Sequence, residues 1–545
     1  MRRTSLRSKT WRYHGSLLVL ALIGWLAAGE PLGAAEVHIT TNAQRPTEAP
    51  ALEMKDDAVQ LSLDQAIEIA LQQNLGLVIQ RYVRTQQRLG ITQSLGLYDL
   101  LANATLQAED DNSATVSSTE ASKFKQKQFN FSFRQVVPTG GNVTLGWNSS
   151  RTESNAGVRQ VPTSYSTGLG FIFNQPLLRN FGRQNVEREI LVAQTNSRVS
   201  HQEFERQVTV TVQQVEDAYW ALVGARQQLV VAQESLGLAR DLHERNRIQV
   251  EVGTLAPLNL VQSEAAIASR EEDIIRATSA IGDAEDQLRQ ILNLPSGDLW
   301  QKAIQPTTPP QTERISIDVN QAITTAFAER PELHTEELRV AQARLDAEFF
   351  RGQLKPSLDL SLDYGYSGLG LIFRDAFDQI TGLDFRGWTA RLTFAYPIQN
   401  RAARAQSATA NLEVERFLTE LDQLKSTIST EVRRSARAVE TAAKQIDAAR
   451  ISREFQEKNL DAERKRYENG MSTTFQITQI QEDVTQARSD EVAATIAYRT
   501  ALAEYYRVVG RLLEQQGVTI DDPDEPDYAS RRFSFHREPL PGEER

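Results

Sequence analysis

A long helical pattern that occurs twice in this chain constrains its fold more than any other feature. Between residues 421 and 512, apolar residues recur every three or four positions, which places them on one stripe of a helix. The stripe of the first arm comprises Leu421, Leu424, Ile428, Val432, Ala436, Val439, Ala442, Ile446 and Ala449. Gly470 marks a turn, and a second arm follows it. An ordinary coiled coil would explain this stretch if it stood alone.

The same pattern occurs between residues 183 and 294. The stripe of its first arm comprises Phe204, Val208, Val212, Val215, Tyr219, Leu222, Leu229, Ala232 and Leu236. Gly253 lies in the turn, and the second arm covers about residues 259–294. Upstream, residues 61–67 are similar to residues 315–323. We therefore predict an internal duplication, with a first repeat over 61–300, a second over 315–517, and linkers at 36–60 and 301–314.

The N-terminus predicts export. An apolar run at 17–28 follows five basic residues and precedes Gly33-Ala34-Ala35, so we expect a signal peptide over 1–35. A retained anchor helix is the alternative, but the run is short for a bilayer. Elsewhere the sequence has no run of the roughly 18 apolar residues that a spanning helix needs. Any membrane-spanning part of the mature chain is therefore expected to consist of strands.

Strand-like alternation precedes each long helical pattern. In the second repeat, Leu358, Leu360 and Leu362 alternate with Asp359, Ser361 and Asp363. A second alternating segment, with Arg391 on its polar side, covers 388–394. This is the pattern of a membrane β-barrel, with Asp359, Asp363 and Arg391 as candidate lumen residues. A half-buried strand of a soluble sheet, with these charges facing water, is the alternative.

The first repeat has four alternating segments, at 101–107, 129–133, 143–147 and 169–173. The turn sequence at 138–141 predicts an extra hairpin that either widens a barrel or lies outside it. One chain thus offers four to six strands, whereas a closed barrel needs about eight. Because exposed sheet edges are a liability, several chains are expected to share one barrel. Helical arms of roughly 50–65 residues would extend about 75–100 Å from it.

Short motifs accompany the duplication: residues 61–67 (LSLDQAI), 175–182 (QPLLRNFG) and 467–470 (YENG). The order of these motifs, together with the duplication, resembles that of the outer-membrane efflux protein family, the TolC-like channels of bacteria with two membranes. The resemblance implies a mainly α fold with a membrane β-barrel portion. It implies a homotrimer that forms one shared barrel in the outer-membrane lipid and an α-helical tunnel projecting into the periplasm.

The function that the resemblance implies is that of an outer-membrane exit duct. Such a duct serves a tripartite efflux or type I secretion system, with a periplasmic adaptor protein and an inner-membrane pump as partners. It transports small molecules or unfolded protein passively from the periplasm to the exterior. A rival interpretation is a periplasmic coiled-coil adaptor or tether, with a structural role and no pore.

The resemblance also implies a periplasmic mouth at the helix turns, where Gly253 and Gly470 mark candidate sites of adaptor docking. The candidate gate residues are Leu258, Asn259, Tyr467, Ser472, Gln476 and Gln479. Relatives are expected to carry acidic rings and an arginine latch there, whereas this chain has glutamine and serine. Hydrogen bonding or packing would then close the mouth. A plain solvated helix face is the alternative explanation for these polar residues.

Composition excludes several classes of function. The chain has no cysteine, which rules out disulfides, thiolate metal sites and cysteine nucleophiles. Its net charge of -11 does not indicate a nucleic-acid-binding protein, because such proteins usually carry an excess of basic residues. The six histidines are scattered, and no Walker loop, nucleophile elbow or HExxH motif occurs. We therefore predict no enzyme activity, no catalytic residue, no cofactor and no metal. The proline-rich tail over 518–545 is expected to be disordered.

Overall fold

The structure is a computed structural model that describes residues 54–55, 58–112, 114, 123–155, 163–294 and 297–520. All of these residues belong to one unit, Pro50–Arg545. The predicted signal peptide, most of the predicted linker at 36–60 and most of the predicted tail at 518–545 lie outside the described residues.

A six-stranded antiparallel sheet joins strands from both predicted repeats, in the order β3-β4-β5-β6-β8-β9. The strands are β3 (Leu101–Asn112), β4 (Lys123–Val136), β5 (Asn142–Ser154), β6 (Thr163–Pro176), β8 (Ser357–Gly370) and β9 (Arg386–Ala395). The predicted turn at 138–141 connects β4 to β5 inside this sheet, so the extra hairpin widens it. β3, β4 and β5 are longer than the alternating segments at 101–107, 129–133 and 143–147, because each strand extends into the polar residues that follow or precede its alternating segment.

The register of this sheet gathers apolar side chains on one face. Cross-strand partners on that face include Phe131 and Trp147, Leu145 and Phe171, and Tyr364 and Trp388. Several side chains of this face are exposed within the single chain: Leu106 is 82%, Trp388 74% and Leu392 62% exposed. The opposite face carries polar residues from the same strands. An exposed apolar face of this extent is typical of a surface that lipid or protein covers.

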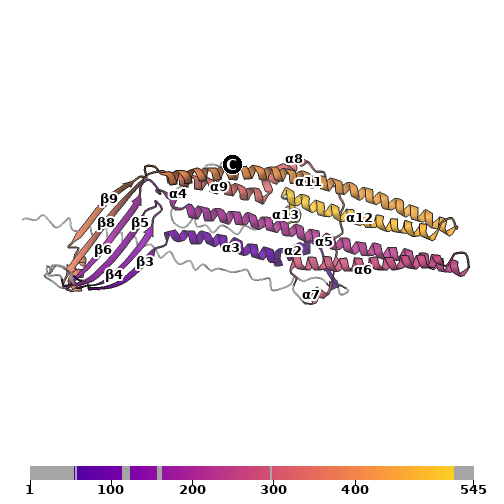
Figure 1. Cartoon of the computed structure of the whole chain (residues 1–545), viewed down its shortest axis with the longest axis horizontal. Helices are drawn as coiled ribbons and strands as arrows, with labels where there is room; N and C mark the ends of the chain where they lie inside the picture. Colours follow the sequence, from indigo (N-terminus) through magenta and orange to yellow (C-terminus); the bar gives the residue numbers. More distant parts are fainter. Residues whose placement is uncertain are drawn as a thin grey trace, which may run out of the picture. The chain divides into compact units, whose positions relative to one another are not determined.

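Two helical hairpins extend from the sheet. The first pairs α5 (Arg188–Glu251) with α6 (Leu258–Leu292), and the second pairs α11 (Arg401–Glu468) with α12 (Thr474–Val509). The first arms have 64 and 68 residues, whereas the second arms have 35 and 36. At about 1.5 Å per residue, α11 is roughly 100 Å long. Within this unit, the strands lie at one end and the hairpin turns at the other (Figure 1).

Shorter helices precede the strands of each half. Residues 61–94 have one continuous helical pattern in the sequence, but the structure has two helices there, α2 (Leu63–Gln73) and α3 (Leu75–Leu95). Asn74 separates them because its side-chain oxygen accepts the N–H of Leu77 at 3.2 Å and begins a new helix. The second half has the matching pair α8 (Val319–Glu329) and α9 (Pro331–Gly352).

The predicted linker at 301–314 contributes to a second, small sheet. There β7 (Ala303–Pro306) pairs in parallel with β2 (Ala58–Leu61), which pairs with β1 (Met54–Lys55). The remaining short elements are η1 (Gly96–Tyr98), α4 (Arg183–Val186), α7 (Asp298–Gln301), α10 (Phe373–Thr381) and α13 (Leu512–Gln515). Within the part of the chain that the structure describes, none of the helices is both long and apolar enough to cross a membrane.

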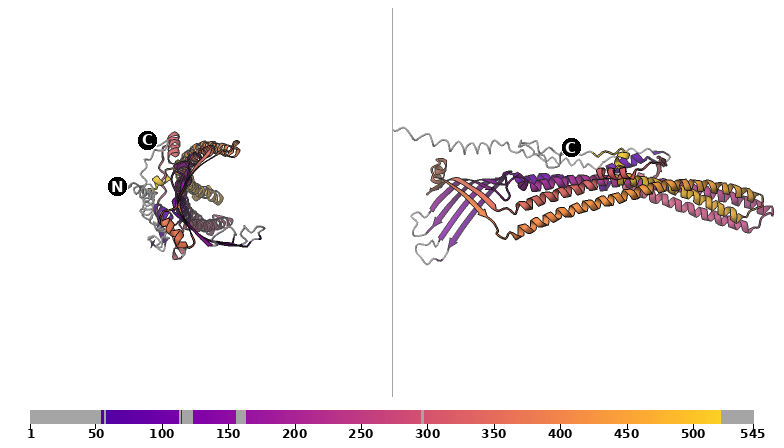
Figure 2. Two further views of the ribbon diagram at one scale, coloured as in Figure 1. Left: turned by 90° about the vertical axis from the view of Figure 1, so that its left-hand side faces the viewer. Right: turned by 90° about the horizontal axis from the view of Figure 1, so that it is seen from above.

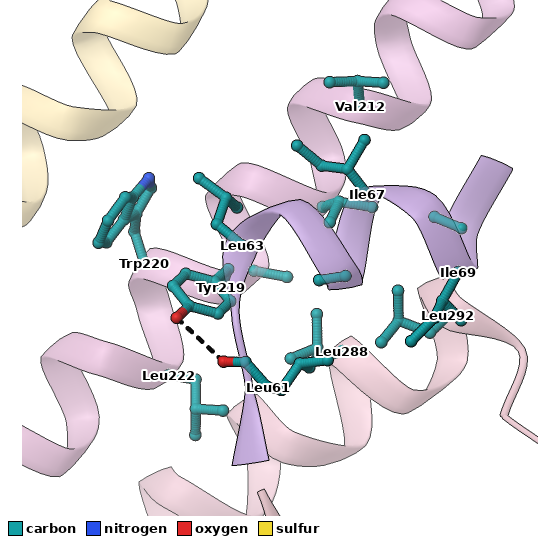
Figure 3. Packing of buried hydrophobic residues seen from close by; sticks show 14 of the residues in the cluster. Leu61, Leu63, Ile67, Ile69, Val212, Tyr219, Trp220, Leu222, Leu288 and Leu292 are labelled. Carbon is teal, nitrogen blue, oxygen red and sulfur yellow. Dashed lines mark hydrogen bonds between the residues drawn. The ribbon is translucent and has the colours of Figure 1, made fainter. Parts of the chain in front are cut away.

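Each half has its own apolar core, where a short helix covers the base of a long hairpin. In the first half, α2 packs against α5 and α6 through residues such as Leu63, Ile67 and Leu288 (Figure 3). The Tyr219 hydroxyl group donates a hydrogen bond to the backbone oxygen of Leu61 at 3.2 Å (Figure 3). In the second half, α8 packs against α11 and α12. These cores fix where each hairpin begins.

Candidate periplasmic mouth

The two hairpin turns have the same backbone geometry. Gly253 and Gly470 adopt φ angles of 79° and 73°, a region in which L-residues with a side chain are strained. The N–H of each glycine bonds to the carbonyl three residues back, and the next N–H bonds to the carbonyl five residues back. This is the Schellman motif, which ends a helix at a left-handed glycine. The two predicted turn glycines therefore occupy equivalent positions.

A buried hydrogen bond connects the two hairpins next to these turns. Tyr467, in the last turn of α11, donates its hydroxyl hydrogen to the side-chain oxygen of Asn246 in α5. The same hydroxyl group lies 3.2 Å from the hydroxyl oxygen of Thr474, at the start of α12. Tyr467 also packs against Leu242 and Ile477. Of the predicted gate residues, Tyr467 is the one that contacts the other hairpin through a buried group.

Two other predicted gate residues, Ser472 and Gln476, belong to the cap of α12. Thr473 and Gln476 form a reciprocal capping box, in which each backbone N–H bonds to the other side chain at 3.3 Å. The Ser472 hydroxyl group donates to Glu463 and also lies 3.2 Å from the Gln476 side-chain oxygen. These residues therefore hold the start of the helix in place.

The remaining predicted gate residues do not lie together with Tyr467. Gln479 is exposed, and its amide lies 3.4 Å from a carboxylate oxygen of Asp483 on the same helix. Leu258 is 66% exposed, and the Asn259 amide donates to the backbone oxygen of Ala256 at 3.1 Å. Within one chain, Gln479 and Leu258 face outward from the hairpins.

Ion pairs also connect the two hairpins, and the sequence pattern did not predict their partners. Arg245 of α5 contacts Glu468 of α11 at 2.5 Å, and Arg270 of α6 contacts Glu482 of α12. Further along, the Arg488 guanidinium lies 2.5 Å from Glu234. Charged groups therefore join the two hairpins here, in addition to the hydrogen bond of Tyr467. Sequence alone gave no signal for these pairs, since the partners lie in different helices.

The three candidate lumen residues share the polar face of the sheet. Asp359 and Asp363 on β8 lie opposite Thr393 and Thr389 on β9, and Arg391 lies opposite Ser361 between them. Because side chains alternate along a strand, all three project away from the apolar face.

Two neighbouring carboxyl groups, the buried Glu216 and the half-buried Asp217, lie farther from the turns, where α5 packs on α12 and α13. Burial raises the pKa of Glu216 to about 7, against the opposing effects of a hydrogen bond from Gln516 and the charge of Arg499. Burial and the nearby Glu504 carboxylate raise the pKa of Asp217 to about 6. The Gln516 amide nitrogen lies 2.6 Å from a Glu216 oxygen. Two groups with raised pKa values thus lie where α5 meets α12 and α13.

This architecture was compared with those of known protein families and solved structures. A profile of the family described as "Outer membrane efflux protein" matches residues 141–294 and 322–511. The curated protein "Pyoverdine export outer membrane protein OpmQ" of Pseudomonas putida is 23% identical over 308 residues, which cover 54% of this chain. The aligned region spans 61% of the length of that relative, less than two thirds of it.

Several solved structures have a similar fold. The CmeC outer membrane channel of Campylobacter jejuni has a TM-score of 0.61 and 14% identity, with 83% of this chain and 86% of that chain covered. The outer membrane protein VceC of Vibrio cholerae has a TM-score of 0.61 and 13% identity, with 82% and 96% covered. A membrane protein of Pseudomonas aeruginosa has a TM-score of 0.62 and 16% identity, with 86% and 100% covered.

Proposed function

Because this chain belongs to the outer membrane efflux protein family, we propose that it is the outer-membrane exit duct of a tripartite efflux or type I secretion system. The chain is an outer-membrane protein. In the proposed function it passes small molecules or unfolded protein outward without performing covalent chemistry. The observation that carries this proposal is the six-stranded sheet, whose two edge strands have no partner strand among the residues that the structure describes.

The sheet is too small to close alone. A closed barrel needs about eight strands, and the described part of this chain supplies six to one sheet. Both edge strands, β3 and β9, are exposed along their whole length. Since six antiparallel strands leave β3 and β9 running in opposite directions, β9 of one copy can pair antiparallel with β3 of the next. Three copies, as the resemblance implies, would give a barrel of 3 × 6 = 18 strands.

The faces of the sheet suit such a barrel. The exposed apolar face would contact lipid, and the face with Asp359, Asp363 and Arg391 would line the lumen. Barrels of 16–18 strands leave an aqueous channel. The extra hairpin of the first half, β4 and β5, therefore favours a wide, water-filled exit.

The helical hairpins would form the wall of the periplasmic tunnel. Two repeats, over 61–300 and 315–517, would contribute equivalent pairs of helices, as the matching glycine turns support. The turns at Gly253 and Gly470 are the proposed contact with a periplasmic adaptor, because their glycines expose backbone at the tip of each hairpin. The proposed mouth consists of Leu258, Asn259, Tyr467, Ser472, Gln476 and Gln479. Among these residues, Tyr467 is proposed to contribute most to keeping the mouth closed, because its hydrogen bond joins the two hairpins.

One of the relatives supports a proposal about the cargo. OpmQ is named for the export of pyoverdine, and a small molecule is the cargo that we propose first, with unfolded protein as the second class. An inner-membrane pump would supply the energy, because a passive duct supplies none.

Membrane fractionation tests this proposal against a periplasmic tether. The duct predicts that the chain is recovered with the outer membrane and migrates as a trimer that heating converts to a monomer. A soluble periplasmic species would instead support the tether. The double variant Trp388→Asp/Leu392→Asp, which places charge on the apolar face of β9, should be lost from the membrane. The matched variant Thr389→Lys/Thr393→Lys, which places charge on the polar face of the same strand opposite Asp363 and Asp359, should remain there.

A further inference from the structure

A nine-residue helix, α10, lies on the apolar face of the sheet near the strand ends that point away from the long helices (Figure 2, right). Gly368 and Gly370 of β8 share this face with Tyr364 and Tyr366, because side chains alternate along the strand. A Cβ atom at Gly368 would overlap the backbone oxygen of Ala376. At Gly370 it would lie 2.8 Å from the Ala376 nitrogen. The two glycines therefore let α10 approach the strand closely.

Side chains then hold α10 in place. The Gln379 amide donates to the backbone oxygen of Leu369 at 3.0 Å, and its oxygen accepts the backbone N–H of Leu369 at 2.9 Å. Ala376 and Ile380 are buried against the sheet. The two hydrogen bonds between Gln379 and Leu369, together with the close packing over Gly368 and Gly370, fix the position of α10 on the sheet.

Half of the apolar side of α10 is left uncovered. Phe373 and Phe377 lie one turn apart and stack with ring centroids 5.8 Å from each other. They are 42% and 40% exposed, although their helix packs against β6 and β8. Arg374 and Asp378, which form an ion pair at 3.8 Å, lie on the polar side. The helix is thus amphipathic, and the sheet uses part of its apolar surface.

The position of α10 along β8 indicates what covers these rings. From the long helices outward, the apolar face of β8 carries Leu358, Leu360 and Leu362, then Tyr364 and Tyr366, and then the two glycines. Eight steps from Leu358 to Tyr366 span about 27 Å along the strand, or roughly 20 Å of depth at a tilt near 40°. An apolar band about 25 Å tall, bordered by aromatic residues, is the membrane-facing zone of outer-membrane barrels. α10 lies immediately beyond this aromatic border.

We propose that α10 is an interfacial helix whose Phe373 and Phe377 side chains enter the boundary between headgroups and acyl chains in the outer leaflet. Amphipathic helices with aromatic apolar faces bind this boundary. The helix that carries the uncovered rings lies on the same side of the sheet as its exposed apolar face, which supports lipid as the occupant. A second copy of the chain does not fit as well, because α10 packs on β6 and β8 while β9 forms the edge that a neighbour would pair with. The helix would fix the depth of the barrel in the membrane.

The absence of cysteine makes a direct test possible. Single variants Phe377→Cys and Asp375→Cys, in the full chain, each carry one nitroxide label on opposite sides of α10. The labelled proteins are reconstituted in vesicles of phosphatidylethanolamine and phosphatidylglycerol. Collision rates with oxygen, which concentrates in lipid, and with a water-soluble nickel chelate are then measured by electron paramagnetic resonance.

The proposal predicts an oxygen-to-nickel collision ratio several-fold higher at position 377 than at 375. Equal, high nickel accessibility at both positions would overturn it, because α10 would then lie in water. A label at 377 that neither reagent reaches would also overturn it, because protein would cover the rings. Flotation of the wild type and of each variant with vesicles distinguishes a failure of the α10 proposal from a failure of the proposed function. If the wild type does not float with the vesicles, the proposed function as an outer-membrane duct is contradicted. If it floats normally but the collision ratios at 377 and 375 are equal, only the proposed role of α10 is contradicted.

Discussion

The hydroxyl group of Tyr467 in α11 donates a hydrogen bond to the side-chain oxygen of Asn246 in α5, and this bond joins the two helical hairpins beside their turns. Tyr467 is 5% exposed and Asn246 is 0% exposed, so water does not compete for the bond. The two residues are 221 positions apart in the chain. Any movement that separates the hairpins at this end must break the bond.

Removing this hydroxyl group should loosen the mouth. In Tyr467→Phe, the Asn246 oxygen remains buried without its donor, which costs about 1–3 kcal/mol. If the closed state alone makes this bond, the open fraction rises roughly tenfold, since about 1.4 kcal/mol is a factor of ten. Uptake of a large antibiotic by cells that carry the variant measures the effect. Tyr505→Phe, which removes the hydroxyl group of another buried tyrosine far from the turns, is the matched control and should leave uptake unchanged.

Replacing the two glutamines at the start of α12 should also increase leakage, by different amounts. Gln476→Ala removes half of the capping box and an acceptor near Ser472, so the helix start loosens. Gln479→Ala removes only an exposed contact with Asp483 and should have a smaller effect. Ion conductance of the purified channel measures both. Unchanged conductance in both variants would remove these residues from the mouth.

Neutralising the acids of the polar sheet face should change ion selectivity without loss of the trimer. Asn replaces Asp with nearly the same volume, so the double variant Asp359→Asn/Asp363→Asn keeps the packing of β8. With two fewer negative charges per chain, the preference for cations should decrease, and a reversal potential under a salt gradient measures it. Aggregation of the variant would mean that these residues do not face water. Asp64→Asn, on the exposed start of α2, is the control.

The raised pKa values of Glu216 and Asp217 predict a pH dependence of stability. Because burial raises the pKa of Glu216 from 4.5 to about 7, the unfolded chain loses its proton first as pH rises. The free energy of unfolding should therefore fall between about pH 4.5 and 7, by up to about 3 kcal/mol for this group.

Glu216→Gln should remove most of this dependence, leaving the smaller contribution of Asp217, whose pKa burial raises to about 6. The variant should unfold at a higher temperature than the wild type at pH 8 and at a similar temperature at pH 5. Circular dichroism during heating provides the measurement. Glu264→Gln, which changes an exposed carboxyl group on α6, should follow the wild type at both pH values. A Glu216→Gln curve that matches the wild type would contradict the role of burial.

The long helices were predictable because their apolar stripes repeat over many turns. Ile428 and Val432, from the predicted stripe, are fully buried. The break at Asn74 was not predictable from the same periodicity, because apolar residues continue on both sides of it. Its amide donates to the backbone oxygen of Ile291 at 2.8 Å, a contact with a residue 217 positions away. Tertiary contacts of this kind decide where a helix ends.

In the sheet and at the mouth, too, sequence periodicity could not predict features that depend on contacts between residues distant in the chain. β3 continues to Asn112 because charged residues pair across strands there, as Lys125 and Asp110 do at 2.8 Å. An apolar alternation pattern does not detect such pairs. At the mouth, the sequence singled out Tyr467 but not Asn246, since an asparagine in a polar helix has no distinguishing pattern until its distant partner is known.

The central claim is that sheets too small to close alone are completed by further copies of the chain around a water-filled channel. Single-channel recording in a planar bilayer tests this most directly, because it requires insertion, assembly and a continuous pore together. The account predicts discrete, long-lived steps of ion conductance from the purified wild-type trimer. A protein that remains a soluble monomer and never changes the conductance of the bilayer would contradict it.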